Sequence, residues 1–110
     1  MHVDKIYYEF NKIMSMRKPY QIHSSNEKEK KESERFEAIL NFVLSQFKEE
    51  YKTIFTRTYL TNDYQFWWLE YYCKSSYYRK RCKAVTSFVR LFKMIYENFT
   101  DVPAITSANV

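Results

Sequence analysis

The chain contains no glycine among its 110 residues, where an average domain has about 7%. Phosphate-binding loops, dinucleotide fingerprints and two-residue hairpin turns need glycine for positive φ or for close backbone approach, so all three are excluded. Proline is nearly as scarce, because only Pro19 and Pro103 occur. Helix breakers are therefore rare in the long central stretch. We predict an all-α fold, a single helical domain over residues 1–110.

Long hydrophobic runs are also missing. No apolar stretch approaches the roughly 18 residues that span a bilayer, and Asp4 and Glu9 interrupt any signal-peptide core in "MHVDKIYYEF". These two absences predict a cytoplasmic protein without a membrane partner.

Cysteine is represented only by Cys73 and Cys82. On one straight helix, positions nine residues apart are too distant for a disulfide, so we expect two free thiols in a reducing compartment. His2 and His23 stand far from them in the sequence, and a structural zinc site needs four ligands. We therefore expect no metal and no other cofactor.

Catalytic groups do not form a recognisable constellation. His23 lies beside Ser24 and Ser25, but sequence neighbours do not make a catalytic triad, and no orienting acid is indicated. The carboxylates of residues 27–37 are typical of a solvated helix face. We expect a protein that is not an enzyme.

Apolar spacing predicts the helices. Ile6, Phe10, Ile13 and Met14 form one stripe, with the spacing of an amphipathic helix. The charged run "EKEKKESER" is expected to project into water before an amphipathic stretch begins at Phe36. Trp67, Trp68 and Tyr77 are assigned to packing, and Tyr78 is expected on the core side. The expected helices are 3–15, 27–47, 48–60, 64–72 and 76–97, joined by a connector at 16–26 and followed by a loose tail.

The net charge of +5 is concentrated in one segment. Residues 1–73 contain eleven Lys and Arg and eleven Asp and Glu, whereas residues 74–96 contain seven cations and no acid. An excess confined to one element is the footprint expected of a polyanion contact, and the alternative is a solvated basic helix without a ligand. The seven cations are Lys74, Arg79, Lys80, Arg81, Lys83, Arg90 and Lys93.

Residues 47–96 read as three helices: a support, a short helix and a long basic helix after a tight polar connection at 73–76. That is helix-turn-helix order, in which the last helix enters the major groove of DNA. We interpret 47–96 as a C-terminal helix-turn-helix portion.

The same segment resembles a known family. "FKEEYKTIFTRTYL…WWLEYYCKSSYYRKRCKAVTSFVRLF" is similar to region 4 of the sigma-70 family, to its phage relatives, the ArpU/RinA-type regulators, and to small sigma-like proteins of mycoplasmas. Residues 48–51 match the acidic helix of the family pattern, 73–77 match its Ser-rich turn, and Ala84-Val85 falls at the expected spacing. Nothing resembles sigma region 2, so a complete sigma factor is not expected. The resemblance implies a sequence-specific DNA-binding transcription regulator, with RNA polymerase as a candidate second partner.

The resemblance and helix geometry agree on roles for the site residues. Lys74, Ser75, Ser76 and Arg79 occupy the first turns of the recognition helix, where side chains reach base edges. Lys80 and Lys83 are suited to phosphates, with Lys52 and Arg57 as additions from the supporting helix. Cys73 stands where the family has an N-capping Ser, so the cap is expected to move to Ser75 or to water.

Two other interpretations stay open. A helical interaction module would use the basic helix to bind an acidic partner protein, and an RNA binder would stack bases on exposed tyrosines. Exposure of the tyrosine rings separates RNA stacking from groove insertion. The operator sequence, the direction of regulation and the oligomeric state are left open by the sequence.

Overall fold

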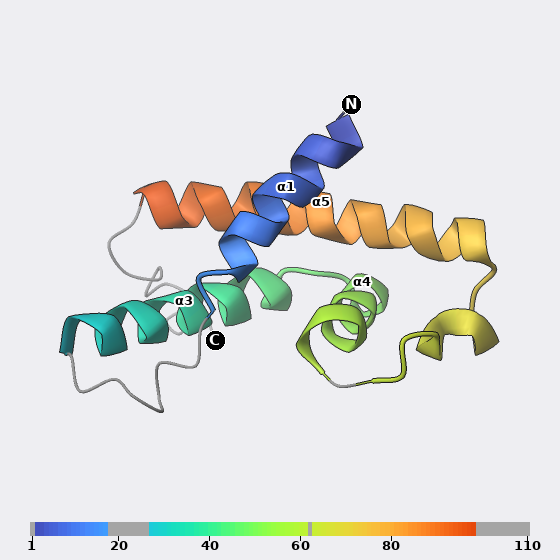
Figure 1. Ribbon diagram of the computed structural model, residues 1–110, viewed down its shortest axis with the longest axis horizontal. Coiled ribbons are helices and arrows are strands. Elements are labelled where there is room, and N and C mark those ends of the chain that lie inside the picture. The colour runs from blue at the N-terminus through green and yellow to red at the C-terminus, as the bar shows by residue number, and fades with distance from the viewer. Residues whose placement is uncertain (1, 18–26, 62, 99–110) are drawn as a thin grey trace.

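Figure 1 shows the computed structural model, in which residues 2–17, 27–61 and 63–98 are described. These ranges contain no strand, and the predicted all-α fold is confirmed. The expected connector beyond Arg17 and the expected tail from residue 99 lie outside the described residues. The elements are α1 (His2–Met14), α3 (Glu27–Ser45), α4 (Glu49–Phe55), a π-helical turn η1 (Thr56–Leu60), a 3₁₀ turn η2 (Trp67–Glu70) and α5 (Lys74–Asn98).

The chain changes direction without glycine. No described residue has a positive φ, so each turn is built from conformations open to ordinary residues. Lys48, which precedes α4, and Thr61, which follows η1, both have extended backbones, with ψ of 151° and 168°. The connections at these two boundaries therefore each include an extended residue that needs no glycine.

Helix α5 is the central element of the fold. Figure 1 shows α1 crossing it and α3 running alongside its C-terminal half, while α4 lies near its N-terminal half. Its buried stripe includes Val85, Phe88 and Phe92, each at most 1% exposed. The ring of Phe88 lies 5.7 Å from that of Phe10 and 4.7 Å from that of Phe55. Burial of each such ring stabilises the fold by about 1.5–3 kcal/mol. Because the stripe of α5 contacts rings from both α1 and α4, much of the core packs against it.

A second, smaller core holds the N-terminal end of α5. It consists of Ile54, Trp67, Trp68 and Tyr77, all buried, so the packing role expected for the two tryptophans and Tyr77 is confirmed. The rings of Trp68 and Tyr77 stack 4.3 Å apart and only 5° from parallel. This cluster fixes where α5 begins.

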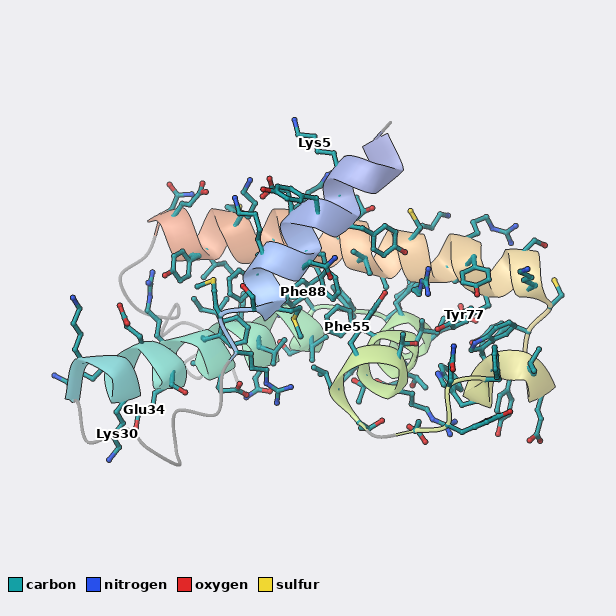
Figure 2. All side chains as sticks on the ribbon, in the orientation of Figure 1. Lys5, Lys30, Glu34, Phe55, Tyr77 and Phe88 are labelled. Atoms are coloured by element: carbon teal, nitrogen blue, oxygen red, sulfur yellow. The ribbon has the colours of Figure 1, made fainter. Side chains whose placement is uncertain are left out.

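The first turns of α3 extend into solvent, as the charge pattern predicts. Lys30 and Glu34 point away from the body in Figure 2 and are exposed. The rest of α3 packs in the core and makes two polar contacts with other parts of the chain. Arg17 donates to the carboxylate of Glu37 at 2.8 Å, and Arg35 donates to the backbone carbonyl of Tyr96 at 2.8 Å.

Two expectations were wrong, one for the segment before α5 and one for the first turns of α5. The helix expected over 64–72 is only the four-residue turn η2, because Arg57 and Thr61 hold the carboxylate of Asp63 and Phe66 has a non-helical backbone. Tyr78 is 37% exposed rather than on the core side. It follows Tyr77 directly, so it is turned about 100° from a residue that fills the small core.

Candidate nucleic-acid interface

The leading end of α5 is capped by Cys73. Its carbonyl accepts the first helical hydrogen bond, from Tyr77 N–H at 2.9 Å, which defines the N-cap position. The Ser76 backbone N–H, first, and the Ser75 hydroxyl bond to its sulfur and lower the pKa of the thiol. The N-cap therefore stays at Cys73 and does not move to Ser75. In a serine N-cap, the side-chain oxygen accepts from the backbone N–H at the same position.

The first turns present a short polar and basic tip. Lys74, Ser75 and Arg79 are exposed, and Ser76 is partly so. In Figure 1 this end of α5 lies at one extremity of the molecule, next to η2. Unpaired N–H groups and the helix dipole make such an end attractive to anions. The four residues expected to contact base edges are thus brought together at a protruding point.

Aromatic packing holds this tip in place. The Tyr77 hydroxyl lies 2.7 Å from the Thr58 hydroxyl in a partly buried contact, and its ring stacks on Trp68. One side of the first turn of α5 is therefore attached to η1 and η2. The opposite side carries Ser75 and Arg79 and is left open.

Arg81 is partly buried between α1 and α5. Its Nε donates to the Tyr7 hydroxyl at 3.2 Å, and its guanidinium lies 4.6 Å from the centre of the Tyr78 ring. Such cation–π contacts strengthen when the cation is desolvated. Arg81 therefore joins α1 to α5 and is less available to a phosphate than an exposed cation.

Two more cations of α5 are paired with acids. Lys80 Nζ lies 3.2 Å from the carboxylate of Glu50, which also accepts a hydrogen bond from the Tyr72 hydroxyl at 3.1 Å. The bond from Lys80, followed by that from Tyr72, lowers the pKa of Glu50. Lys93 pairs with Glu9 of α1 at 3.5 Å. A phosphate would have to compete with these carboxylates.

Three cations remain on one face of α5, and two of them, Lys83 and Arg90, also line a groove between α5 and the junction of α3 with α4. Arg79, Lys83 and Arg90 are exposed, and none of them takes part in an ion pair within the described ranges. Their spacing of four and seven residues places them on one face. With a rise of 1.5 Å per residue the row is about 16 Å long. With Lys74 at the tip, these residues form the basic edge of α5.

The two candidates on the supporting helix differ. Arg57 binds both carboxylate oxygens of Asp63, at 3.1 and 3.2 Å, and its guanidinium lies 4.4 Å from the centre of the Trp67 ring. Lys52 is exposed on α4 and forms no ion pair with a described residue. Arg57 is thus engaged in structure, whereas Lys52 is open to solvent.

Sequence reasoning omitted Arg90 from the site, although its spacing from Arg79 and Lys83 signals the shared face. It could not have found the pairing of Glu50 with Lys80, which are 30 residues apart. Both cysteines are free thiols, as expected. Within the described residues, no three His, Cys, Asp or Glu side chains gather into a group that could hold a metal ion, and no helix has the length and apolarity to cross a membrane.

A scan against protein-family models and searches of curated proteins and of solved structures found no match to this chain.

Proposed function

We propose that the protein is a DNA-binding transcription regulator that inserts the leading end of α5 into the major groove. The observation that carries the proposal is the basic edge: Lys74, Arg79, Lys83 and Arg90 are exposed, lie on the protruding helix and form no ion pair with a residue that the structure describes. A row of cations without carboxylate partners loses little when it exchanges water and counterions for phosphates.

The roles follow from position along α5. Arg79, within two turns of the tip, can bond guanine O6 and N7 in a bidentate manner, and Ser75 and Ser76 can bond either base type. Lys83 and Arg90, farther along the edge, are placed for backbone phosphates on either side of the groove. In this proposal η2 and α5 replace the usual pair of helices, with a single 3₁₀ turn as the first member. The resemblance to sigma region 4 adds RNA polymerase as a candidate partner.

The proposal is tested by selecting bound duplexes from a random pool and titrating the selected site at several salt concentrations. Arg79→Ala should weaken binding and relax the sequence preference. Lys83→Ala should lower the affinity for selected and random duplexes alike. It should also reduce the salt slope of binding by about 0.9, the value for one lost phosphate contact. Lys31→Ala, which removes an exposed cation from the solvated start of α3, is the matched control. It should change neither the sequence preference nor the salt slope of binding.

Single-stranded RNA is the second candidate ligand. Tyr64 is 71% exposed and Tyr71 is 65% exposed, and both flank the 3₁₀ turn beside the tip of α5. Stacking of a base on such a ring contributes about 1–3 kcal/mol. If Tyr71→Ala weakens RNA binding while duplex binding is absent at low salt, RNA replaces DNA as the ligand. Duplex binding unaffected by Arg79→Ala and Lys83→Ala would contradict the proposed surface.

A further inference from the structure

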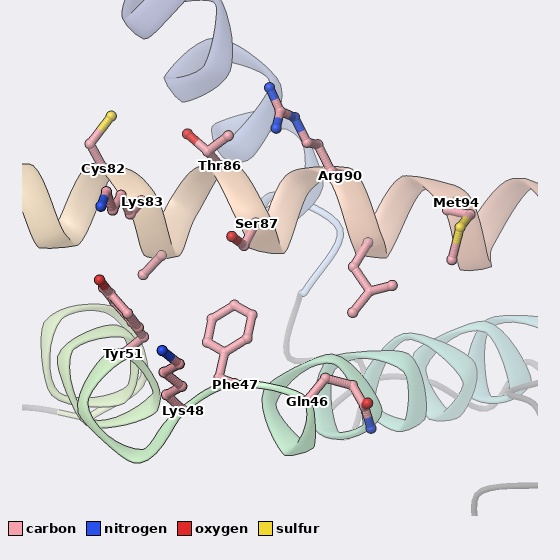
Figure 3. Close-up of a pocket in the computed structure, with 12 residues that line it drawn as sticks. Gln46, Phe47, Lys48, Tyr51, Cys82, Lys83, Thr86, Ser87, Arg90 and Met94 are labelled. Atoms are coloured by element: carbon pink, nitrogen blue, oxygen red, sulfur yellow. The ribbon is translucent and has the colours of Figure 1, made fainter.

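A groove of about 730 Å³ lies between α5 and the junction of α3 with α4. Figure 3 shows Gln46, Phe47, Lys48 and Tyr51 on one side of it and the α5 side chains on the other. This volume lies within the range of ligand-binding clefts in proteins. The leading end of α5, from Lys74 to Arg79, is not part of its wall, so the groove is separate from the tip proposed to contact base edges.

The floor of the groove is apolar and supported by the core. Phe47 packs edge-on against the buried Phe55, with ring centres 6.2 Å apart, and its ring stands in the gap in Figure 3. Leu91 is partly exposed and Met94 is 50% exposed. An apolar strip held in a fixed shape and left uncovered is typical of a docking surface.

The rim of the groove carries positive charge only. Lys48, Lys83 and Arg90 line it, and no acidic residue does. All three are exposed, and none forms an ion pair with a described residue. Lys48 and Lys83 stand at the same end of the gap in Figure 3, on opposite walls. A ligand that covers the floor would therefore bring its polar groups close to cations, which favours carboxylates at those positions.

The shape favours a helix as the ligand. The α5 wall includes Lys83, Ser87, Leu91 and Met94, a face about 16 Å long at 1.5 Å per residue. That length matches three turns of a partner helix, whose apolar side chains recur at i, i+3/i+4 and i+7. We propose that the groove binds an acidic amphipathic helix of a partner protein, with its apolar face on Phe47, Leu91 and Met94 and its carboxylates toward Lys48 and Lys83.

A second copy of the chain fits less well. The described helices carry little acidic excess to match the rim: α1 has two acids and two bases, α3 has five acids and four bases, and α4 has two acids and one base. Self-association through the groove would therefore bring together helices of balanced charge. A heterologous acidic helix satisfies both the floor and the rim.

The test uses the full chain and three synthetic fluorescein-labelled peptides in an anisotropy titration. The first peptide has Leu at helical i, i+3, i+4 and i+7 spacing with Glu on both flanks. The second has Lys in place of every Glu, and the third has the composition of the first in scrambled order. We expect saturable binding of the first peptide and at least about tenfold weaker binding of the other two, because each loses either the charge match or the apolar face.

Two variants locate the binding. Met94→Glu should lower the affinity for the acidic peptide about tenfold or more, as expected for an anchor residue. Leu69→Glu, at a 58% exposed position outside the groove, should leave this affinity unchanged. Lys48→Glu should lower the affinity for the acidic peptide several-fold, and Lys31→Glu should not. Circular dichroism verifies that each variant is folded.

The groove proposal is overturned if the basic or scrambled peptide binds as tightly as the acidic one, or if a folded Met94→Glu variant binds like the unmodified chain. Concentration-dependent dimerisation that Met94→Glu abolishes would assign the groove to a second copy instead. Neither Met94 nor Lys48 belongs to the proposed DNA surface, so both variants should keep the duplex sequence preference and lose affinity only through the screened change in net charge. Loss of peptide binding with duplex binding retained, or the reverse, therefore tells which of the two proposals fails.

Discussion

Cys73 is in an unusual position for a thiol. It is exposed at the N-terminus of a long helix, where the end of the helix carries about half a positive charge. The Ser76 N–H and the Ser75 hydroxyl bond to its sulfur, and Arg79 lies one turn further on. These groups all favour the thiolate and lower the pKa of the thiol. Cys82, about two and a half turns along the same helix, is partly buried and does not cap a helix.

This difference predicts selective alkylation. In a Cys82→Ser variant, the rate of reaction of Cys73 with iodoacetamide should rise with pH around a midpoint below that of an ordinary thiol, because the thiolate is the nucleophile and forms at lower pH. In urea the cap is lost, so the midpoint should return to the ordinary value of about 8.5. The measurement is the alkylation rate across pH by mass spectrometry. Identical midpoints in the folded and unfolded chains would contradict the capping role.

Arg81 shows what the charge count could not provide. The concentration of cations in residues 74–96 was evident from the sequence, but a cation count does not say which way each side chain points. Arg81 falls four residues after Tyr77 and seven before Phe88, on the buried stripe of α5. That spacing indicated an inward direction. Its partner, the Tyr7 hydroxyl, comes from α1 and could not be predicted from local pattern.

Helix α5 owes the position of its leading end to its contact with η1 and η2. The hydroxyls of Thr58 and Tyr77 form the polar part of that contact, at 2.7 Å, beside a small core of Ile54 and aromatic side chains. A buried hydroxyl without a partner costs more than the hydrogen bond contributes when it is made. The hydrogen bond between these hydroxyls therefore fixes the position of the leading end of α5 more than it adds to the free energy of unfolding.

A double-mutant cycle tests this constraint. Thr58→Val leaves the Tyr77 hydroxyl buried without its partner and should lower the free energy of unfolding by about 1–3 kcal/mol. Adding Tyr77→Phe removes the stranded hydroxyl, so the double variant should be less destabilised than the sum of the single variants by about 0.5–2 kcal/mol. Urea unfolding followed by circular dichroism measures each value. Simple additivity would mean that the two hydroxyls do not act as a pair.

At the scale of elements, apolar periodicity was sufficient for the long helices and insufficient for the short one. The helix expected at 76–97 is Lys74–Asn98, and that expected at 3–15 is His2–Met14, because many repeats of one stripe define each. The segment 64–72 holds too few residues to show a period. Its conformation depends instead on the bond between Arg57 and Asp63, and neither η2 nor the π-helical turn had a signal in the sequence.

At the scale of the whole molecule, the surplus charge is smaller at the surface of α5 than the sequence suggests. Of the seven cations, Arg81 is partly buried against tyrosine rings, and Lys80 and Lys93 are paired with Glu50 and Glu9. The exposed positive field is left to the basic edge of α5. Glu50 is well placed to limit that field, since it holds Lys80 beside Arg79 and Lys83.

Releasing Lys80 should therefore strengthen nucleic-acid binding. Glu50→Gln removes the carboxylate that holds the ammonium group, so Lys80 becomes available to a phosphate, and the salt slope of duplex binding should steepen by about 0.9.

Glu49→Gln is the matched control: it removes the same charge from the adjacent exposed residue, which forms no ion pair with a described residue. It should raise affinity only through the weaker, screened change in net charge. Titration at several salt concentrations separates the two effects. In a Lys80→Ala background the two variants should become equivalent, and a steeper slope for Glu50→Gln in that background would show that Lys80 is not the cation released.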